Sequence, residues 1–177
     1  MTLSESLSLI ACMGHLAVAF LVLARGKKNA LAIPVALLCV NFFLWNFATW
    51  AHEVSGQDLW LWLDRSLSPL ALPLALHVTM RFVRGPDAYR PVLGAFYVIY
   101  GALALSSTLA FMSPVGRDWV QSSAWKLTYL LGIGAMMVTS LGLLRRHLKE
   151  TSNHDEQVRM RLFLAAVILG GALGSTE

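Results

Sequence analysis

Apolar residues fall in six runs along the chain, and short polar connections separate the runs. Five runs have about the twenty residues that an α-helix needs to cross a hydrocarbon core of roughly 30 Å. The six runs cover residues 7–24, 30–51, 59–80, 92–112, 125–144 and 162–174, and the last is the shortest. The pattern predicts an all-α, polytopic transmembrane helical bundle of five complete helices plus a sixth, with residues 1–177 forming one transmembrane region.

The composition argues against a soluble domain. Of the 177 residues, 56% are apolar and 14% are charged, whereas an average soluble domain has about 25% charged residues. A soluble domain of this size leaves roughly 30% of its unfolded surface in contact with water. The charged side chains are too few to cover that surface, so we do not expect a soluble enzyme.

Basic residues are concentrated in alternate connections, which hold eleven of the 14 lysines and arginines. They are Arg25, Lys27 and Lys28 after the first run, Arg81, Arg84 and Arg90 after the third, and Arg145, Arg146, Lys149, Arg159 and Arg161 after the fifth. Basic connections favour the cytoplasmic side of a membrane. The distribution therefore predicts a multi-pass protein with its N-terminus outside, and it explains the net charge of +4 without a nucleic-acid partner.

The sixth run returns outward in this topology, and the sequence ends as the run ends. We therefore expect a fragment of a longer protein, cut before a seventh helix that leads to a cytoplasmic output. A complete six-helix protein is the alternative.

Polar groups inside membrane helices are costly, which makes them candidates for function. The densest set lies in the second and third runs: Asn41, Trp45, Asn46, Trp50, Trp62, Arg65, Pro69, Pro73 and His77. Two prolines four residues apart should bend their helix and leave two carbonyls without donors. Asn41, Asn46 and His77 could bond those carbonyls or a ligand. The set predicts a pocket near the outer leaflet for a small or lipid-like ligand.

A purely structural interpretation of the same residues stays open. Trp50 and Trp62 fall near a predicted membrane boundary, where aromatic residues gather in any case. Asp64 and Arg65 can form a boundary ion pair, and His77 can donate to a neighbouring helix. Short glycine spacings, such as Gly132-Ile133-Gly134, suit close packing of helices.

The motifs that carry covalent or metal chemistry do not occur in the sequence. There is no phosphate-binding glycine loop, no His-Glu-x-x-His, no Cys-x-x-Cys and no Gly-x-Ser-x-Gly. We therefore predict no catalytic residue, no metal site and no cofactor for this segment.

The second and third runs carry a pattern that is familiar. Asn41, Trp45 and Trp50 precede Trp60 or Trp62, and Ser68-Pro69-Leu70-Ala71-Leu72-Pro73-Leu74-Ala75-Leu76-His77 then leads to Arg81-Phe82. This pattern resembles the N-terminal seven-transmembrane-helix sensor region of bacterial histidine kinases. The basic connection 84–90 and Gln157-Val158-Arg159-x-Arg161 fit the same resemblance.

The resemblance implies the input region of a two-component sensor histidine kinase in the bacterial inner membrane. It also implies a homodimer formed through a cytoplasmic region that this sequence does not encode. The input region of a diguanylate cyclase is a related alternative. A small multi-helix transporter or channel subunit is a further alternative, whereas a lipid-modifying enzyme is disfavoured because paired carboxylates and a clustered nucleophile are absent.

Overall fold

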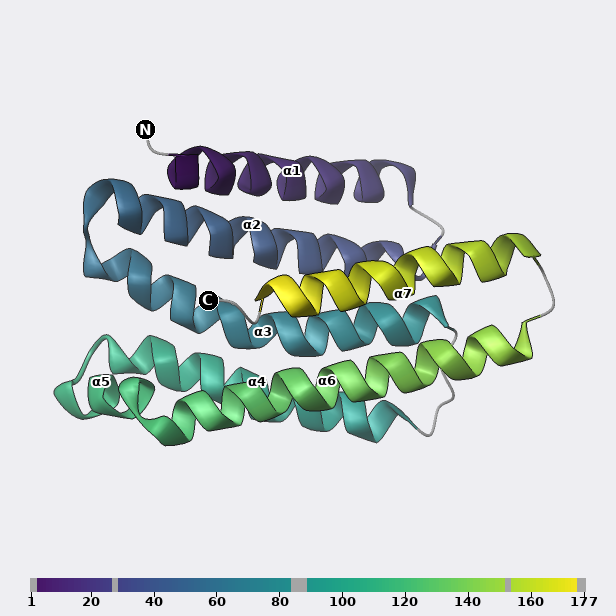
Figure 1. Cartoon of the computed structure of the whole chain (residues 1–177). Coiled ribbons are helices and arrows are strands. Elements are labelled where there is room, and N and C mark those ends of the chain that lie inside the picture. The colour runs from purple at the N-terminus through teal and green to yellow at the C-terminus, as the bar shows by residue number, and fades with distance from the viewer. Residues whose placement is uncertain (1–2, 27–28, 84–88, 152–153, 175–177) are drawn as a thin grey trace.

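The computed structural model describes residues 3–26, 29–83, 89–151 and 154–174, and within them every element of secondary structure is a helix (Figure 1). The helices are α1 Leu3–Arg25, α2 Ala32–Ser55, α3 Asp58–Phe82, α4 Arg90–Ala110, α5 Pro114–Gln121, α6 Ser123–Glu150 and α7 His154–Gly174. The predicted all-α bundle is confirmed. Each of the six apolar runs lies within or largely overlaps one of the six long helices.

Four of the described helices are long and apolar enough to cross a membrane, namely α1 from Ser8 to Arg25, α2, α4 and α6. Helix α3 has 25 residues, which is sufficient length, but prolines and charged groups lower its hydropathy below that of the four. It is also the central helix, in contact with α2, α4 and α6. A helix surrounded by protein does not need an apolar surface on every side.

Two boundaries differ from the sequence prediction. Helix α7 begins at His154, whereas the apolar run begins at residue 162, so much of the expected polar connection is helical. The first turn carries Asp155 and Glu156, which favour a helix N-terminus although they are polar. Gln157 links this helix to the residue that follows α6, because its side-chain amide donates to the Thr151 carbonyl at 2.8 Å.

The short helix α5 was expected as part of a loop. Ser113 begins it, and the Ser113 hydroxyl accepts a hydrogen bond from the Gly116 amide at 3.0 Å. Pro114 follows in the first helical position, where its missing N–H costs nothing. Eight residues are too few to show a helical period in the hydropathy pattern, so the sequence did not reveal this element.

Consecutive long helices run antiparallel, which brings alternate connections to the same end of the bundle (Figure 1). The described ends of α1, α3 and α6, which precede the basic connections, lie at one end of the bundle. The α2–α3 connection and α5 lie at the opposite end. Lys27, Lys28 and Arg84, and most of the connection 84–90, are outside the described residues. Which end of the bundle faces the cytoplasm stays a prediction.

The core follows α3 through the bundle. It contains Leu72 and Leu76 of α3, Leu103 of α4, Leu143 and Leu144 of α6, and Met160 of α7. Large apolar side chains on the outside of the bundle are exposed, for example Phe20, Val98 and Val138, each by more than 70%. Such a surface is typical of helices that face lipid rather than water.

Candidate functional site

A cavity of about 370 Å³ lies between α2, α3 and α6, near the end of the bundle that carries α5. We call it the α2–α3–α6 pocket. Its lining combines aromatic rings with charged groups, and its volume is within the usual range for small-molecule sites, about 300–1,000 Å³. The side chains that carry the argument below are Trp45, Thr49 and Glu53 of α2, Asp64 and Arg65 of α3, and Trp125 and Tyr129 of α6.

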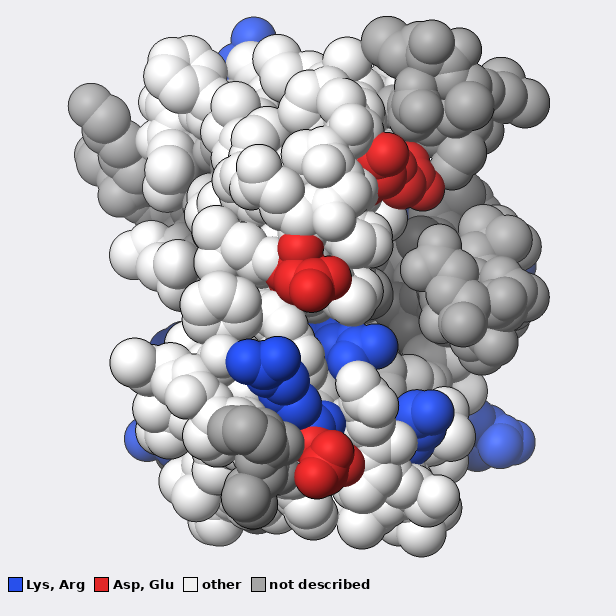
Figure 2. All heavy atoms as spheres, turned by 90° about the vertical axis from the view of Figure 1, so that its left-hand side faces the viewer, with Lys and Arg blue, Asp and Glu red and all other residues white. Residues whose placement is uncertain are grey.

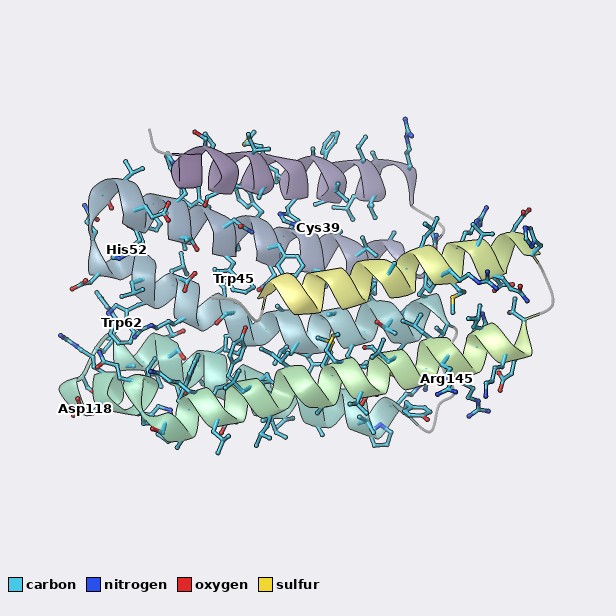
Figure 3. The ribbon with its side chains drawn as sticks, in the orientation of Figure 1. Cys39, Trp45, His52, Trp62, Asp118 and Arg145 are labelled. Carbon is cyan, nitrogen blue, oxygen red and sulfur yellow. The ribbon has the colours of Figure 1, made fainter. Side chains whose placement is uncertain are left out.

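The views of the molecule agree with this placement. Figure 3 shows Trp45 and His52 on α2 and Trp62 on α3 towards the end of the bundle that carries Asp118 of α5. Arg145 lies towards the opposite end. Figure 2 looks onto the first of these ends and shows acidic and basic side chains close together near its middle. The pocket end therefore carries both signs of charge.

Thr49 joins α2 to α3 inside the pocket. Its hydroxyl lies 2.9 Å from Asp64 Oδ1, to which it donates, and 3.2 Å from the Trp45 carbonyl of its own helix. A hydrogen bond to a carboxylate is stronger than one between neutral groups. The Asp64 side chain is therefore held in place by the facing helix.

Arg65 lies over an aromatic ring but does not use all its donors. Its guanidinium carbon is 5.4 Å from the centre of the Trp62 ring, which is a cation–π distance. Its Nη1 atom is buried and has no hydrogen-bond partner among the described residues. A buried donor without an acceptor costs about 1–3 kcal/mol. An acceptor that enters the pocket would remove this cost.

The α6 side of the pocket is aromatic and contacts α4 through side chains. Trp125 is buried, and its indole N–H donates to Ser107 of α4 at 3.2 Å. The Trp125 and Tyr129 rings stack at 5.6 Å. One turn further along α6, Gly132 receives the Tyr100 ring of α4, because a Cβ at this glycine would overlap that ring. The close packing that the glycine spacing predicted is therefore found at Gly132, whereas a Cβ at Gly134 would meet nothing within 4 Å.

The two prolines of α3 follow the pocket residues of that helix along the chain. Pro69 and Pro73 are buried, and they follow Arg65 by one and two turns of α3. An α-helix pairs each N–H with the carbonyl four residues earlier, so these prolines leave the Arg65 and Pro69 carbonyls without their helical donors.

The donors expected for those carbonyls have other partners. Asn41 donates to the Leu67 carbonyl at 3.3 Å, and Asn46 donates to the Phe42 carbonyl of its own helix at 2.7 Å. Of the two roles that the sequence left open for these residues and His77, bonding to the carbonyls freed by the prolines is therefore not found among the described residues. Contact with a ligand stays a prediction. Asn41 still connects α2 to α3, but at a carbonyl that lies two residues from each of the two carbonyls that the prolines leave free.

His77 is separate from the pocket. Its Nδ1 is 3.0 Å from the Tyr97 hydroxyl of α4, and its Nε2 accepts a hydrogen bond from Arg81 Nε at 3.3 Å. Because Nε2 is the acceptor, Nδ1 carries the proton and donates to Tyr97. His77 thus connects α3 to α4 towards the basic end, which agrees with the interhelical role that the sequence left open.

The structure therefore places the nine predicted site residues in different surroundings. Trp45 and Arg65 line the pocket, and Trp62 supports Arg65 from the core. Trp50 packs against Phe47 with ring centres 5.7 Å apart, and its indole nitrogen is buried without a partner among the described residues. Whether any of them binds a ligand stays a prediction.

Sequence reasoning did not assign Trp125 and Tyr129 to the site. The only signal was their spacing of four residues, which puts both rings on one face of α6. Which helix faces the second and third runs cannot be read from hydropathy, so the third wall of the pocket appeared only in the structure. Thr49 shares a face with Trp45 in the sequence, and Asp64 had been assigned only to a boundary ion pair.

Two other hollows are less suited to a ligand. One, of about 480 Å³, lies between the ends of α1 and α2 and is lined mainly by apolar side chains such as Leu21 and Val35. The other, of about 500 Å³, lies along the surface of α6 alone. Neither brings charged side chains from several helices together, so the α2–α3–α6 pocket is the stronger candidate.

The chain was compared with family models, with curated proteins and with solved structures, and none of them matches it.

Proposed function

We propose that the chain is the membrane-embedded input region of a bacterial signal-transduction protein of the sensor histidine kinase type. In this proposal a small ligand binds in the α2–α3–α6 pocket, and α3 carries the signal towards the cytoplasm. The observation that supports it most is the position of the pocket. Its charged groups Asp64 and Arg65 belong to the same central helix as Pro69 and Pro73.

The physical mechanism requires two arrangements of the bundle that bind the ligand differently. Helix α3 contacts α2, α4 and α6, so a change in its shape is passed to most of the bundle. Two missing backbone hydrogen bonds make the middle of α3 the part that changes shape at the lowest cost. A ligand that contacts Arg65 acts one turn from the first proline.

A transporter or channel is less well supported. Transport needs a polar route from one end of the bundle to the other. In the described residues, the part of α3 between the pocket and His77 packs Leu72 and Leu76 into the apolar core. The input region of a diguanylate cyclase is consistent with the same pocket, because only the output differs.

The test uses the full-length product of the natural gene in membrane vesicles. We expect it to autophosphorylate, and we expect Pro69→Ala with Pro73→Ala to change the rate by about fivefold or more, the lower range of allosteric couplings. Pro91→Ala is the matched control, because Pro91 lies in the first turn of α4 and displaces no helical hydrogen bond.

The alternatives give different results in the same preparation. Absence of phosphoryl transfer together with synthesis of a cyclic dinucleotide would move the proposal to a cyclase. Solute flux through proteoliposomes without either activity would contradict it. An unchanged rate in the double proline variant would remove α3 from the mechanism.

A further inference from the structure

The charged groups of the α2–α3–α6 pocket are of both signs and come from two facing helices. Glu53 of α2 and Asp64 of α3 contribute negative charge, and Arg65 of α3 contributes positive charge. A ligand that carries a single charge is attracted by one part of this lining and repelled by the other. A ligand with one charge of each sign can match both parts.

Arg65 provides the site for an anionic group. The Trp62 ring holds the guanidinium in place, and the buried Nη1 lacks an acceptor among the described residues. A guanidinium presents its donors in a planar fork that matches a carboxylate or a phosphate. A half-buried guanidinium whose buried Nη1 has an unused donor is therefore prepared for such a group.

The opposite side of the pocket suits a cationic group. Trp45, Trp125 and Tyr129 contribute aromatic rings, and the indole N–H of Trp125 is already used by Ser107. What Trp125 offers the pocket is therefore its π surface, which attracts ammonium groups. Asp64 adds a carboxylate that Thr49 holds in position.

We propose that the pocket binds a small zwitterion, with its anionic group on Arg65 and its ammonium group among the aromatic rings and the carboxylates of Glu53 and Asp64. The cavity of about 370 Å³ holds roughly a dozen non-hydrogen atoms at about 30 Å³ each. This size suits a free amino acid or betaine, or the headgroup of a zwitterionic lipid. The inference rests on the proposed function only in taking this pocket as a ligand site.

The test measures the thermal unfolding midpoint of the full-length protein in nanodiscs of phosphatidylglycerol, which has no zwitterionic headgroup. The added probes are glycine betaine, γ-aminobutyrate, L-proline and glycerophosphoethanolamine, with acetate and tetramethylammonium as probes of single charge. We expect at least one zwitterion to raise the midpoint, since binding to the folded state stabilises it. We expect acetate and tetramethylammonium to have no effect at the same concentration.

Nanodiscs of phosphatidylethanolamine without added probe distinguish the two sources of the ligand. A raised midpoint there, with a reduced response to free zwitterions, assigns the site to a lipid headgroup. An unchanged midpoint with a retained response assigns it to a free solute. Both outcomes support a zwitterion site.

A substitution separates binding from structural support. Arg65→Gln should abolish the response to zwitterions and create a response to tetramethylammonium, because the repelling charge is gone. Arg117→Gln is the matched control, since Arg117 is an exposed arginine on α5 at the same end of the bundle and outside the pocket. A merely structural role of Arg65 would not produce a change of ligand preference.

The inference is overturned if no zwitterion shifts the midpoint in either type of nanodisc, or if a probe of single charge binds the wild-type protein equally well. Its failure is distinct from that of the proposed function. A zwitterion that binds without changing phosphoryl transfer leaves the site standing and contradicts the sensor. A singly charged compound that controls phosphoryl transfer through the pocket contradicts the zwitterion site and leaves the sensor standing.

Discussion

At the scale of single residues, two neighbouring serines of α4 each accept a hydrogen bond from a tryptophan indole, but in different surroundings. Ser107 accepts the indole N–H of Trp125 in the buried wall of the pocket, and Ser106 accepts that of Trp119, each at 3.2 Å. Ser107 is 0% exposed, whereas Trp119 is 42% exposed. The two hydrogen bonds should therefore contribute differently to stability. The buried Trp125 N–H has no other partner within reach, whereas the exposed Trp119 N–H does.

Ser107→Ala should lower the free energy of unfolding by about 1–2 kcal/mol, since it leaves the Trp125 N–H buried without an acceptor. Ser106→Ala should change it by less than about 0.5 kcal/mol, because Trp119 can bond water or lipid headgroups instead. Reversible unfolding in detergent micelles measures both. Equal effects of the two variants would contradict the interpretation.

Two glycines of α6 provide a second comparison. A methyl group at Gly132 would meet the Tyr100 ring, whereas at Gly134 it would meet nothing within 4 Å. Gly132→Ala should destabilise the protein by about 1–3 kcal/mol through overpacking. Gly134→Ala should be neutral or slightly stabilising, and thermal unfolding of the purified protein checks both. A neutral Gly132→Ala would show that α4 and α6 are not in close contact here.

At the scale of elements, α3 is unusual because it is central and continuous although it contains Pro69 and Pro73. Its neighbours α2, α4 and α6 keep it in place where its own hydrogen bonds are missing. In a membrane protein, surrounding helices can compensate for such gaps. The region around the prolines should therefore open locally more often than the rest of α3.

Pro73→Ala should reduce this opening, because the new N–H can donate to the Pro69 carbonyl. Amide hydrogen exchange in residues 66–76 should slow by about fivefold, the factor that corresponds to a hydrogen bond of about 1 kcal/mol. Pro91→Ala should leave exchange in α3 and α4 unchanged. Faster or unchanged exchange in the Pro73→Ala protein would indicate that the prolines do not weaken α3.

The six long helices could be predicted from hydropathy, because length and apolarity determine which segments suit a bilayer. The start of α7 and the whole of α5 could not. Both depend on polar signals at helix N-termini, Asp155 and Glu156 in one case and Ser113 with Pro114 in the other. A search for apolar runs counts those residues as loop.

At the scale of the whole molecule, the prediction of the site was partial for a different reason. Trp45 and Arg65 were identified because polar and aromatic residues are rare inside apolar helices. Their neighbours across the pocket, Trp125 and Tyr129, lie about sixty to eighty residues further along the chain. Contacts over such a separation arise from packing, which no local pattern encodes.

The two ends of the bundle also differ as a whole. The described helix ends that flank the three basic connections lie at one end of the bundle (Figure 1). The α2–α3–α6 pocket is lined by the last turns of α2 and the first turns of α3 and α6, which lie towards the other end. If basic connections stay in the cytoplasm, the pocket faces the outside and can receive a ligand from there. This orientation is the central claim, because the proposed input region would receive its ligand outside and pass the signal to an output in the cytoplasm.

Cysteine labelling of intact cells tests the orientation most directly. Gln57→Cys places an exposed thiol in the α2–α3 connection, and Ala30→Cys places one in the α1–α2 connection. The wild-type protein gives the background, since Cys12 and Cys39 are both buried. A membrane-impermeant maleimide should label the Gln57→Cys protein in intact cells and the Ala30→Cys protein only after permeabilisation. Labelling of Ala30→Cys but not Gln57→Cys in intact cells would place the pocket on the cytoplasmic side and contradict the account.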